Sequence, residues 1–409
     1  MAWPFSRKSE SVSETKSELT DPTSDSWAAL CDAFGLSASG VTVTAATAMD
    51  CPPVNAGVSI LTESTAGVPC RLLHDDANDS ERAAKDHPAF ALVNRFSNEW
   101  MSSGEVRRRA TQDAVLFGDG FALVTRRAAG QPAEIIYAPR QTVVVEYALT
   151  GEPRYVIDSQ YYGPRDVIHI VWTPYPNDPL QQRGLGLLHA GRNAIGLAIL
   201  LERSASNLFR NSCKPSGIVS VKGALKAEAA ARMATAWRAA NAGDKQGGVS
   251  IMDNDATYTP INFTSVDSQM IEQRAYAVNE ISRLTRVPPT LLADMSRATW
   301  SNSTQLDLQF VKYGLQPLLR AWCDGYSRCL LTPEERSSMH FEFDLSQLLM
   351  ADPAARAAAF VQYRAAGAMT ANDVRRELNL PPLPDGNTLS SPHVQSPAND
   401  NQPQKDVAA

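Results

Sequence analysis

The chain has 409 residues, of which 44% are hydrophobic and 20% charged, and its formal net charge is −6. This composition is ordinary for a soluble folded protein that can bury one large core or several smaller ones. The acidic balance argues against a protein that grips nucleic acid over its whole surface, because such binding needs clustered Lys and Arg; a protein past which DNA slides is not excluded.

Targeting and redox signals are weak. The six cysteines form no CxxC pair and none lies at zinc spacing with a histidine, so reduced, mostly buried thiols in a cytoplasmic chain are predicted. The first twenty residues are rich in Ser, Glu and Lys and do not resemble a signal peptide. The most apolar run, Ala194 to Leu201, is too short to cross a bilayer, so no membrane partner is expected.

The N-terminal half predicts an α+β unit. Disorder is expected up to about residue 45, with one short apolar patch around Trp27 to Leu36. Helices are then predicted from Met49 to Gly67, from His87 onward and over Ser103–Phe117, with a strand at Val68–Leu73. Short runs rich in β-branched and aromatic residues follow between Gly and Pro turns and predict an antiparallel sheet: Phe121–Thr125, Glu134–Tyr137, Thr142–Tyr147, Arg154–Ile157 and Asp166–Trp172.

A long helical pattern over Gly184–Phe209 would reach roughly 35–40 Å at about 1.5 Å per residue. A compact insertion follows, with a strand, a helix and two more strands predicted at Gly217–Val221, Lys226–Asn241, Gly248–Met252 and Tyr258–Ile261.

A helix–loop–helix organises the rest of the chain. Its first helix, Asp267–Arg286, carries one apolar stripe and ends before Pro288, because proline cannot continue a helix. The loop Ala293–Asn302 displays Met295 and Trp300. A loop with an exposed Trp is expected to pack on something or to line something.

The second helix of this motif is predicted to begin with Ser301 or Ser303 as N-cap and to be kinked or split at Pro317. A strand over His340–Phe343 comes next. Two short helices follow, with start and stop signals at Asp352, Pro353, Gly367, Thr370 and Asp373. From about residue 385 the chain is rich in Pro, Asn, Ser and Gln, which predicts disorder.

The sequence shows no pattern typical of an enzyme, cofactor or metal site: it lacks HExxH, Walker, GxSxG and clustered-carboxylate motifs, and no cofactor is predicted. His169, in a strand, is interpreted as structural. Gly184-Leu185-Gly186 is half of a dinucleotide fingerprint and is interpreted as a flexible helix start. The clusters Arg107–Arg109 and Arg375–Arg376 are interpreted as solvated or salt-bridged helix faces. An α+β enzyme that uses His169 or the Gly184 turn stays open as an alternative.

Eight segments, in a fixed order, carry a resemblance to a known family: Ala56–Leu61 with Val68–Leu73, His87–Asn98, Val115–Phe121, Asp166–Ile170, Gly184–Ile195, Phe209–Val219, Ile281–Leu292 and Gly367–Gly386. Over roughly residues 45 to 386 the chain resembles the portal protein of tailed double-stranded-DNA bacteriophages, of the type common in long-tailed siphophages and gene transfer agents. It departs from the family pattern at Gly118–Phe121, which reads GDGF for GNaY, and at Asn372–Arg375, which reads NDVR for NEvR. The first 45 residues have no counterpart.

The resemblance implies an α+β portal fold that assembles as a ring. The implied parts are a disordered N-terminal segment (1–45), an α+β wing (46–183), a stem helix (184–212), an α/β clip (213–263), a second stem helix (264–289), a tunnel loop with a kinked helix and a return strand to the wing (290–344), a helical crown (345–386) and a disordered tail (387–409).

The resemblance also implies a virion protein that is not an enzyme and is assembled in the host bacterial cytoplasm. It would form a homo-dodecamer at the capsid vertex, conduct double-stranded DNA during packaging and ejection, and dock the large terminase subunit and the head–tail adaptor. The major capsid protein and the scaffold are further expected partners. A ring-forming structural adaptor of the virion that is not a portal is the other alternative, and it predicts rings without terminase contact.

Two groups of residues receive roles from the resemblance. The tunnel loop facing DNA would comprise Met295, Ser296, Arg297, Thr299, Trp300, Ser301 and Asn302. Arg297 is predicted to be the main positive charge near DNA, since DNA that must move fast should meet few fixed Lys or Arg contacts. The clip would contact the terminase or the adaptor through Asn241, Asp244, Lys245 and Gln246.

Overall fold

The computed structural model describes residues 35–75, 81–128, 130–176, 183–210, 218–220, 227–228, 231–232, 235, 257–259, 264–295, 300–349, 353–378 and 380–389. The chain divides into two compact units, one ending at Phe343 and the other beginning at Asp344. Within the described residues, no helix is both long and apolar enough to span a bilayer.

Regular structure begins closer to the N-terminus than the sequence predicts. Gly35 to Val43 form a small hairpin with a bridge between Leu36 and Thr42, and α3 (Ala45–Met49) begins with Thr44 as its N-cap in a capping box. The expectation of disorder up to residue 45 is therefore wrong for this stretch, because Val41 and Val43 are buried and anchor it.

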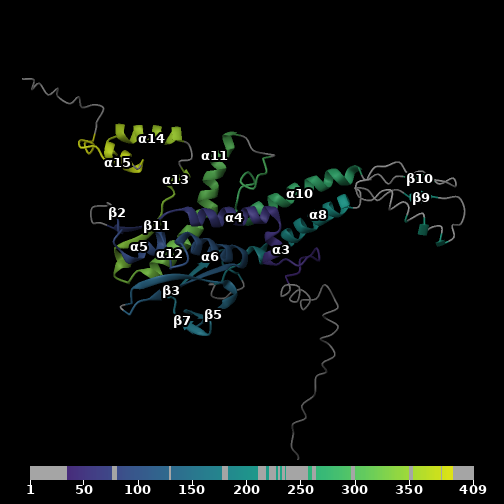
Figure 1. The fold of residues 1–409 in the computed structure, drawn as a ribbon, viewed down its shortest axis with the longest axis horizontal. Helices are drawn as coiled ribbons and strands as arrows, with labels where there is room; N and C mark the ends of the chain where they lie inside the picture. The colour runs from purple at the N-terminus through teal and green to yellow at the C-terminus, as the bar shows by residue number, and fades with distance from the viewer. Residues whose placement is uncertain are drawn as a thin grey trace, which may run out of the picture. The chain divides into compact units, whose positions relative to one another are not determined.

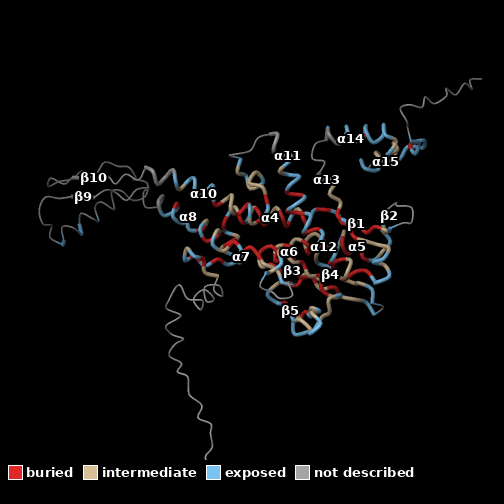
Figure 2. Tube along the Cα trace, turned by 180° about the vertical axis from the view of Figure 1, so that it is seen from behind, coloured by how far each residue is buried: buried red, intermediate tan, exposed pale blue. Residues whose placement is uncertain are grey.

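Two helices that pack side by side form the centre of the first unit: α4 (Pro52–Gly67) and α6 (Ser103–Phe117) (Figures 1 and 2). The hydroxyl of Ser102 accepts the backbone N–H of Glu105 and so caps α6. The helix ends at Gly118, whose φ of 104° lies in the range that glycine tolerates. The bounds predicted for this helix, Ser103–Phe117, are confirmed.

Helix α6 packs on a three-stranded antiparallel sheet with the order β4-β3-β8, formed by Pro132–Ala138, Asp119–Arg126 and Val167–Val171. A second antiparallel sheet has the order β5-β6-β7, formed by Val143–Tyr147, Pro153–Ile157 and Gln160–Tyr162. The predicted strands are present, but they form two sheets where one was expected. The 3₁₀ turn Arg140–Thr142 redirects the chain between β4 and β5, and the sheets share a core around Phe121 and Tyr155.

A third sheet joins distant parts of the chain in the order β11-β1-β2, formed by Met339–Phe343, Cys70–Asp75 and Glu81–Ala83. Helix α12 (Gln316–Leu330) packs on both β8 and β11. Its fully buried Trp322 donates the indole N–H to Thr111 Oγ1 of α6 at 3.0 Å. This helix therefore ties two of the sheets and α6 into one core.

The arginine cluster on α6 is only partly the salt-bridged face that was predicted. Arg108 and Arg109 bond the carboxylate of Glu105, which lowers the pKa of Glu105 to about 2. Arg107 is buried instead, and its guanidinium donates to three carbonyl oxygens, at 2.6 Å to Val93, 2.8 Å to Ala66 and 3.4 Å to Val68. Side chains on successive helical positions point in different directions, so one of the three faces the core.

We expect Arg107→Met to lower the free energy of unfolding by about 3 kcal/mol, since carbonyl oxygens at the end of α4 and in α5 (Pro88–Asn94) would lose their partners inside the protein. Arg108→Met is the matched control, and it should cost less than about 1 kcal/mol because its ion pair is half-exposed. Denaturant unfolding of both variants measures the difference. Equal losses would contradict the structural role assigned to Arg107.

The second unit is a small set of helices, α13 (Ser346–Leu349), α14 (Pro353–Ala365) and α15 (Ala371–Glu377). The predicted capping box is confirmed, with Thr370 and Asp373 bonding each other's backbone N–H. The side chain of Asn372 then bonds both the N–H and the C=O of Leu383, and its backbone N–H bonds Gly386 O. These hydrogen bonds of Asn372 explain why a motif at 372–375 and a glycine at 386 occur together in the sequence.

Candidate functional site

The helix–loop–helix identified in the sequence begins with α10 (Thr264–Thr285). The helix stops as predicted: Arg286 has a φ of 59°, and Val287 is fully buried before Pro288. The hydroxyl of Ser282 donates to the carbonyl of Val287 at 2.6 Å and holds the chain as it leaves the helix. Gly57 of α4 lies so close to Thr285 that a Cβ would approach Thr285 Cγ2 to 2.9 Å, so the end of α10 is packed tightly on α4.

The side chain of Arg286 fastens this helix end to the sheet β4-β3-β8. Its guanidinium lies 5.0 Å from the ring centre of Trp172 and donates to Thr173 Oγ1 at 3.3 Å. Trp172 directly follows β8. The point where the loop leaves the body is thus held from two sides.

Residues 288 to 294 form a series of tight turns. The N–H of Leu291 bonds Pro288 O, and the N–H groups of Leu292 and Asp294 bond Pro289 O, at 2.9 to 3.0 Å. Ala293 has a φ of 64°, a conformation that costs free energy for a residue with a Cβ. After these turns Met295 projects with 70% of its surface exposed.

The predicted tunnel-loop residues are only partly placed. Ser296, Arg297 and Thr299 lie outside the described residues. The backbone of Trp300, Ser301 and Asn302 belongs to α11 (Trp300–Gln309), so the helix begins before the predicted N-caps and the loop is shorter than predicted.

The second helix of the motif is split, as predicted, but not by proline alone. A π-helical segment, Phe310–Leu315, joins α11 to α12, and Pro317 lies directly after it, in the first turn of α12. The Cβ position of Gly314 lies 3.1 Å from the carbonyl oxygen of Arg286. The irregular segment therefore lies directly against the end of α10.

The long helix predicted over Gly184–Phe209 is interrupted. Residues Gly184 to Gly186 are not helical, and Gly191 separates α7 (Leu187–Ala190) from α8 (Arg192–Arg210). A Cβ on Gly184 would lie 1.8 Å from Gly118 O, and one on Gly186 would lie 2.3 Å from Leu116 O. The two glycines allow a close backbone contact, so their interpretation as a flexible helix start is wrong.

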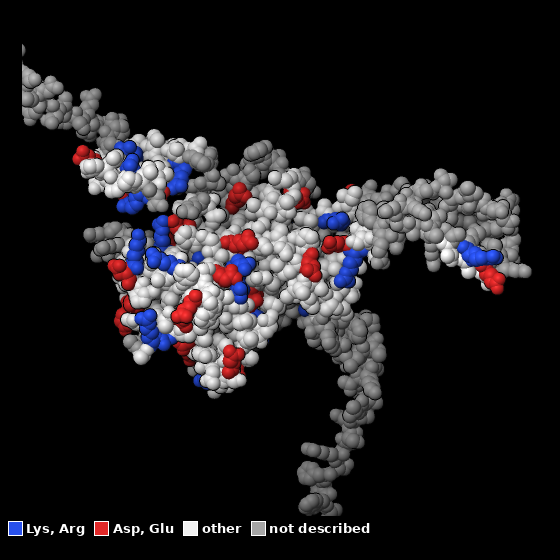
Figure 3. Space-filling model, viewed as in Figure 1, with Lys and Arg blue, Asp and Glu red and all other residues white. Residues whose placement is uncertain are grey.

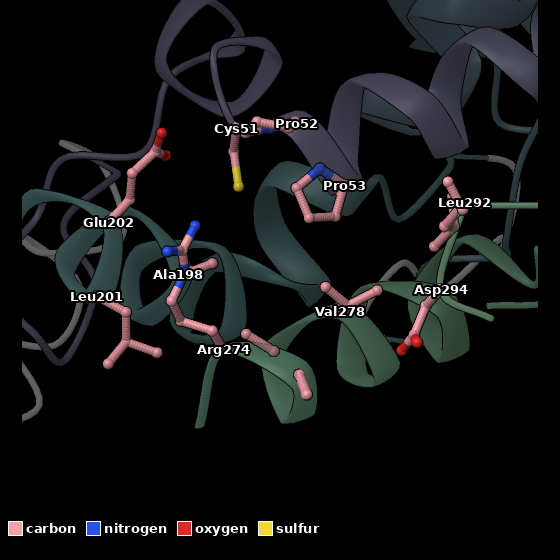
Figure 4. A pocket seen from close by; sticks show the side chains of 13 residues that line it. Cys51, Pro52, Pro53, Ala198, Leu201, Glu202, Arg274, Val278, Leu292 and Asp294 are labelled. Atoms are coloured by element: carbon pink, nitrogen blue, oxygen red, sulfur yellow. The ribbon is translucent and has the colours of Figure 1, made fainter. Parts of the chain in front are cut away.

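Helix α8 packs beside α10, and a pocket of about 420 Å³ lies where both meet the start of α4 and the turn after α10. Figure 4 shows Cys51, Arg274 and Glu202 around one end of this pocket, and Leu292 and Asp294 at the other. Burial raises the pKa of the Cys51 thiol, so this cysteine is a poor nucleophile. The lining residues form no catalytic arrangement, and the pocket lies at the base of the loop.

The residues of the enzyme alternative are engaged in structural bonds. His169 Nε2 lies 3.0 Å from Asp119 Oδ1, and its Nδ1 lies 3.3 Å from the hydroxyl of Tyr155. The backbone N–H of Gly184 donates to the same Asp119 oxygen at 2.7 Å. Because both ring nitrogens of His169 and the N–H of Gly184 already have hydrogen-bond partners, they are not available to bind or activate a substrate. Among the described residues no cluster of His, Cys, Asp or Glu could hold a metal ion.

The four cysteines that the structure describes are unpaired thiols, three of them buried, in agreement with the prediction for those positions: Cys51, Cys70, Cys323 and Cys329. Acidic and basic side chains are interspersed over the face of the described surface that Figure 3 shows. This mixture offers no broad basic patch there for static binding of nucleic acid.

The predicted clip contact residues, Asn241, Asp244, Lys245 and Gln246, lie outside the described residues. Of the insertion between α8 and α10, the structure describes one antiparallel strand pair, β9 (Ile218–Ser220) with β10 (Thr257–Thr259), and a few helical residues between them.

Comparison with known proteins gives a consistent result. The family model described as "Phage portal protein" matches residues 52–379. The portal protein of Enterobacteria phage HK97 is 28% identical over 338 residues, which cover 80% of this chain and 78% of that protein. The probable portal protein of Streptomyces phage phiC31 is 26% identical over 366 residues, covering 86% and 79% of the two chains.

Solved structures show a similar fold. A chain from the neck of an empty gene-transfer-agent (GTA) particle, computed with C6 symmetry, has a TM-score of 0.58 at 22% identity and covers 81% of this chain and 91% of its own length. The crystal structure of an HK97-family phage portal protein from Corynebacterium diphtheriae has a TM-score of 0.54 at 19% identity, with 76% and 98% covered.

Proposed function

The chain belongs to the phage portal protein family, and we propose that it forms a dodecameric ring at one vertex of the capsid, through which double-stranded DNA enters and leaves. The family is one of structural proteins without enzymatic activity, found in the virion at the portal. The mixed α+β fold matches that of portal structures.

The observation that carries the proposal is the closely packed base of the loop after α10. Three features hold it: the Arg286 contact with Trp172, the Ser282 bond to Val287, and the close approach of Gly314 to Arg286 O. A segment that contacts moving DNA has to be anchored firmly to the body of the subunit. We therefore assign Met295, Ser296, Arg297, Thr299, Trp300, Ser301 and Asn302 to the DNA-facing tunnel loop.

The proposal of a ring is supported by apolar side chains that are exposed in a single subunit. Ile271 and Tyr276 on α10 are 71% and 56% exposed, and Leu308 and Tyr313 on the α11 side are 48% and 59% exposed. A ring with head-to-tail contacts needs two different complementary surfaces on each subunit. Relatives in gene-transfer-agent necks were computed with C6 and C12 symmetry, which a dodecamer satisfies.

The other partners are proposed because the protein is assigned to the capsid vertex. We assign contact with the large terminase subunit and the head–tail adaptor to the clip, through Asn241, Asp244, Lys245 and Gln246. We also propose contact with the major capsid protein and the scaffold. A ring-forming adaptor that is not a portal would form rings but would not bind the large terminase.

The experiment is the mass of the purified protein in solution, followed by negative-stain images. We expect rings of about a dozen subunits with a central hole, and we expect Ile271→Glu with Tyr276→Glu to abolish them, because a charge in an apolar contact is costly. Leu149→Glu, at a fully exposed turn residue, is the matched control and should still form rings. A compact monomer that binds a small molecule would overturn the portal assignment.

A further inference from the structure

Helix α10 carries exposed apolar side chains on two opposite faces. On one face Arg274 and Val278 line the pocket between α8 and α10, and Ile271, seven residues before Val278 and 71% exposed, extends that face beyond the pocket. Tyr276 is 56% exposed and lies two residues from both Arg274 and Val278, which places it roughly 160–200° around the helix. The tyrosine therefore points away from the pocket and into solvent.

The pocket suits a tyrosine side chain. Its volume is about 420 Å³, and apolar side chains from α4, α8, α10 and the turn after α10 form much of its lining: Pro53, Ala198, Val278 and Leu292. Glu202 places a carboxylate at one end (Figure 4). A tyrosine has an apolar ring and one O–H donor that usually finds an acceptor when it is buried. An apolar cavity with a carboxylate at its end provides for both parts.

The charges beside the tyrosine complement those beside the pocket. Arg283 lies seven residues beyond Tyr276 on the same face of α10, with its guanidinium 5.8 Å from the ring centre, and it forms an ion pair with Glu280. Glu202 and Arg274 lie around one end of the pocket (Figure 4). Each surface thus carries one charge of each sign, so the two surfaces can meet with opposite charges facing each other.

We propose that Tyr276 of each subunit inserts into the pocket between α8 and α10 of the next subunit, with its hydroxyl donating to Glu202. The inference rests on the proposed ring and names a contact that holds it together. A head-to-tail ring needs a projecting group on one side of the subunit and a receiving surface on the other, and α10 carries both on opposite faces. Because Leu292 and Asp294 close the other end of the pocket, the tyrosine would lie against the base of the neighbouring tunnel loop.

The first test is a photo-cross-link that keeps the aromatic ring. Tyr276→p-azidophenylalanine, irradiated in purified rings, should give a ladder of covalent oligomers, with the attachment mapped by peptide mass spectrometry to residues 198–202, 274–278 or 292–294. Tyr161→p-azidophenylalanine, at a tyrosine that is 68% exposed on β7, is the matched control and should label none of these peptides. Rings without attachment to the pocket would overturn this contact and leave the ring standing. Absence of rings in the wild type would overturn both.

The second test is a double-mutant cycle on the protein concentration at which half of the rings dissociate. Tyr276→Ser removes the inserted side chain and Ala198→Trp fills the pocket, so each should raise this concentration about tenfold or more. The two changes together should have no larger effect than either alone, because both remove the same contact. Tyr161→Ser is the control and should leave the concentration unchanged. Effects that multiply, or no effect of Tyr276→Ser, would overturn the proposal.

Discussion

Gly184→Ala should yield little folded protein, with a loss of at least about 3 kcal/mol in the free energy of unfolding. A Cβ at this position would lie 1.8 Å from the carbonyl oxygen of Gly118 and 2.3 Å from its carbonyl carbon. Both are backbone atoms, so no flexible side chain can move aside. The strand after α6 or the entry to α7 would have to shift, and Asp119, which bonds both the Gly184 N–H and His169, would be disturbed with them.

Gly67→Ala is the matched control, since a Cβ there meets nothing within 4 Å and the residue ends α4 with an ordinary φ. Its stability should equal that of the wild type or exceed it slightly, because alanine favours the helix more than glycine does. Yield of soluble protein, thermal melting and denaturant unfolding measure the effect. If Gly184→Ala unfolds within about 1 kcal/mol of the wild type, the close backbone contact is not as the structure has it.

Deleting Ser296 to Ser301 should abolish the packaging or the retention of DNA in assembled particles, while rings still form. The residues that fix the base of the loop, Ser282, Arg286 and Val287, stay in place, so the surfaces proposed for the ring contacts should be unaffected. What is lost is the segment assigned to the DNA path. DNase-protected DNA per particle is the measurement, and negative-stain images of the rings show that assembly has not failed first.

A length-matched Gly/Ser replacement of the same residues is the control for strain. It keeps the distance between the turn at Asp294 and α11 but removes Arg297 and Trp300. We expect its amount of DNase-protected DNA to lie between those of the wild type and the deletion, since it keeps the full length of the proposed tunnel loop. If the deletion leaves packaging and retention unaffected, the assignment of the tunnel loop is wrong.

Local signals in the sequence predicted local structure well. Helix α6 was predicted at its observed bounds, and its end was marked by the glycine at position 118; the structure adds that Ser102 caps its start. The capping box at Thr370 and the stop at Val287-Pro288 were read in the same way, since each depends on neighbouring residues only.

Contacts between residues that lie far apart in the sequence could not be predicted from it. Gly184 and Gly186 looked like a loose helix start because nothing in their neighbourhood reveals that Gly118 presses against them. Arg107 looked like its neighbours because the carbonyls that it binds lie in other elements. The loop residues gained a role only from the resemblance to portal proteins, since no chemical motif marks a surface past which DNA is meant to slide.

The π-helical segment Phe310–Leu315 has a mechanical consequence. A π-helical turn contains about one residue more than an α-helical turn, so the segment stores spare chain length between α11 and α12. If that residue were passed into α11, the helix would advance by about 1.5 Å and rotate by about 100°. Helix α12 would stay where Trp322 and Thr111 hold it. Transfer of the spare residue into α11 would thus move the loop by one step without moving α12.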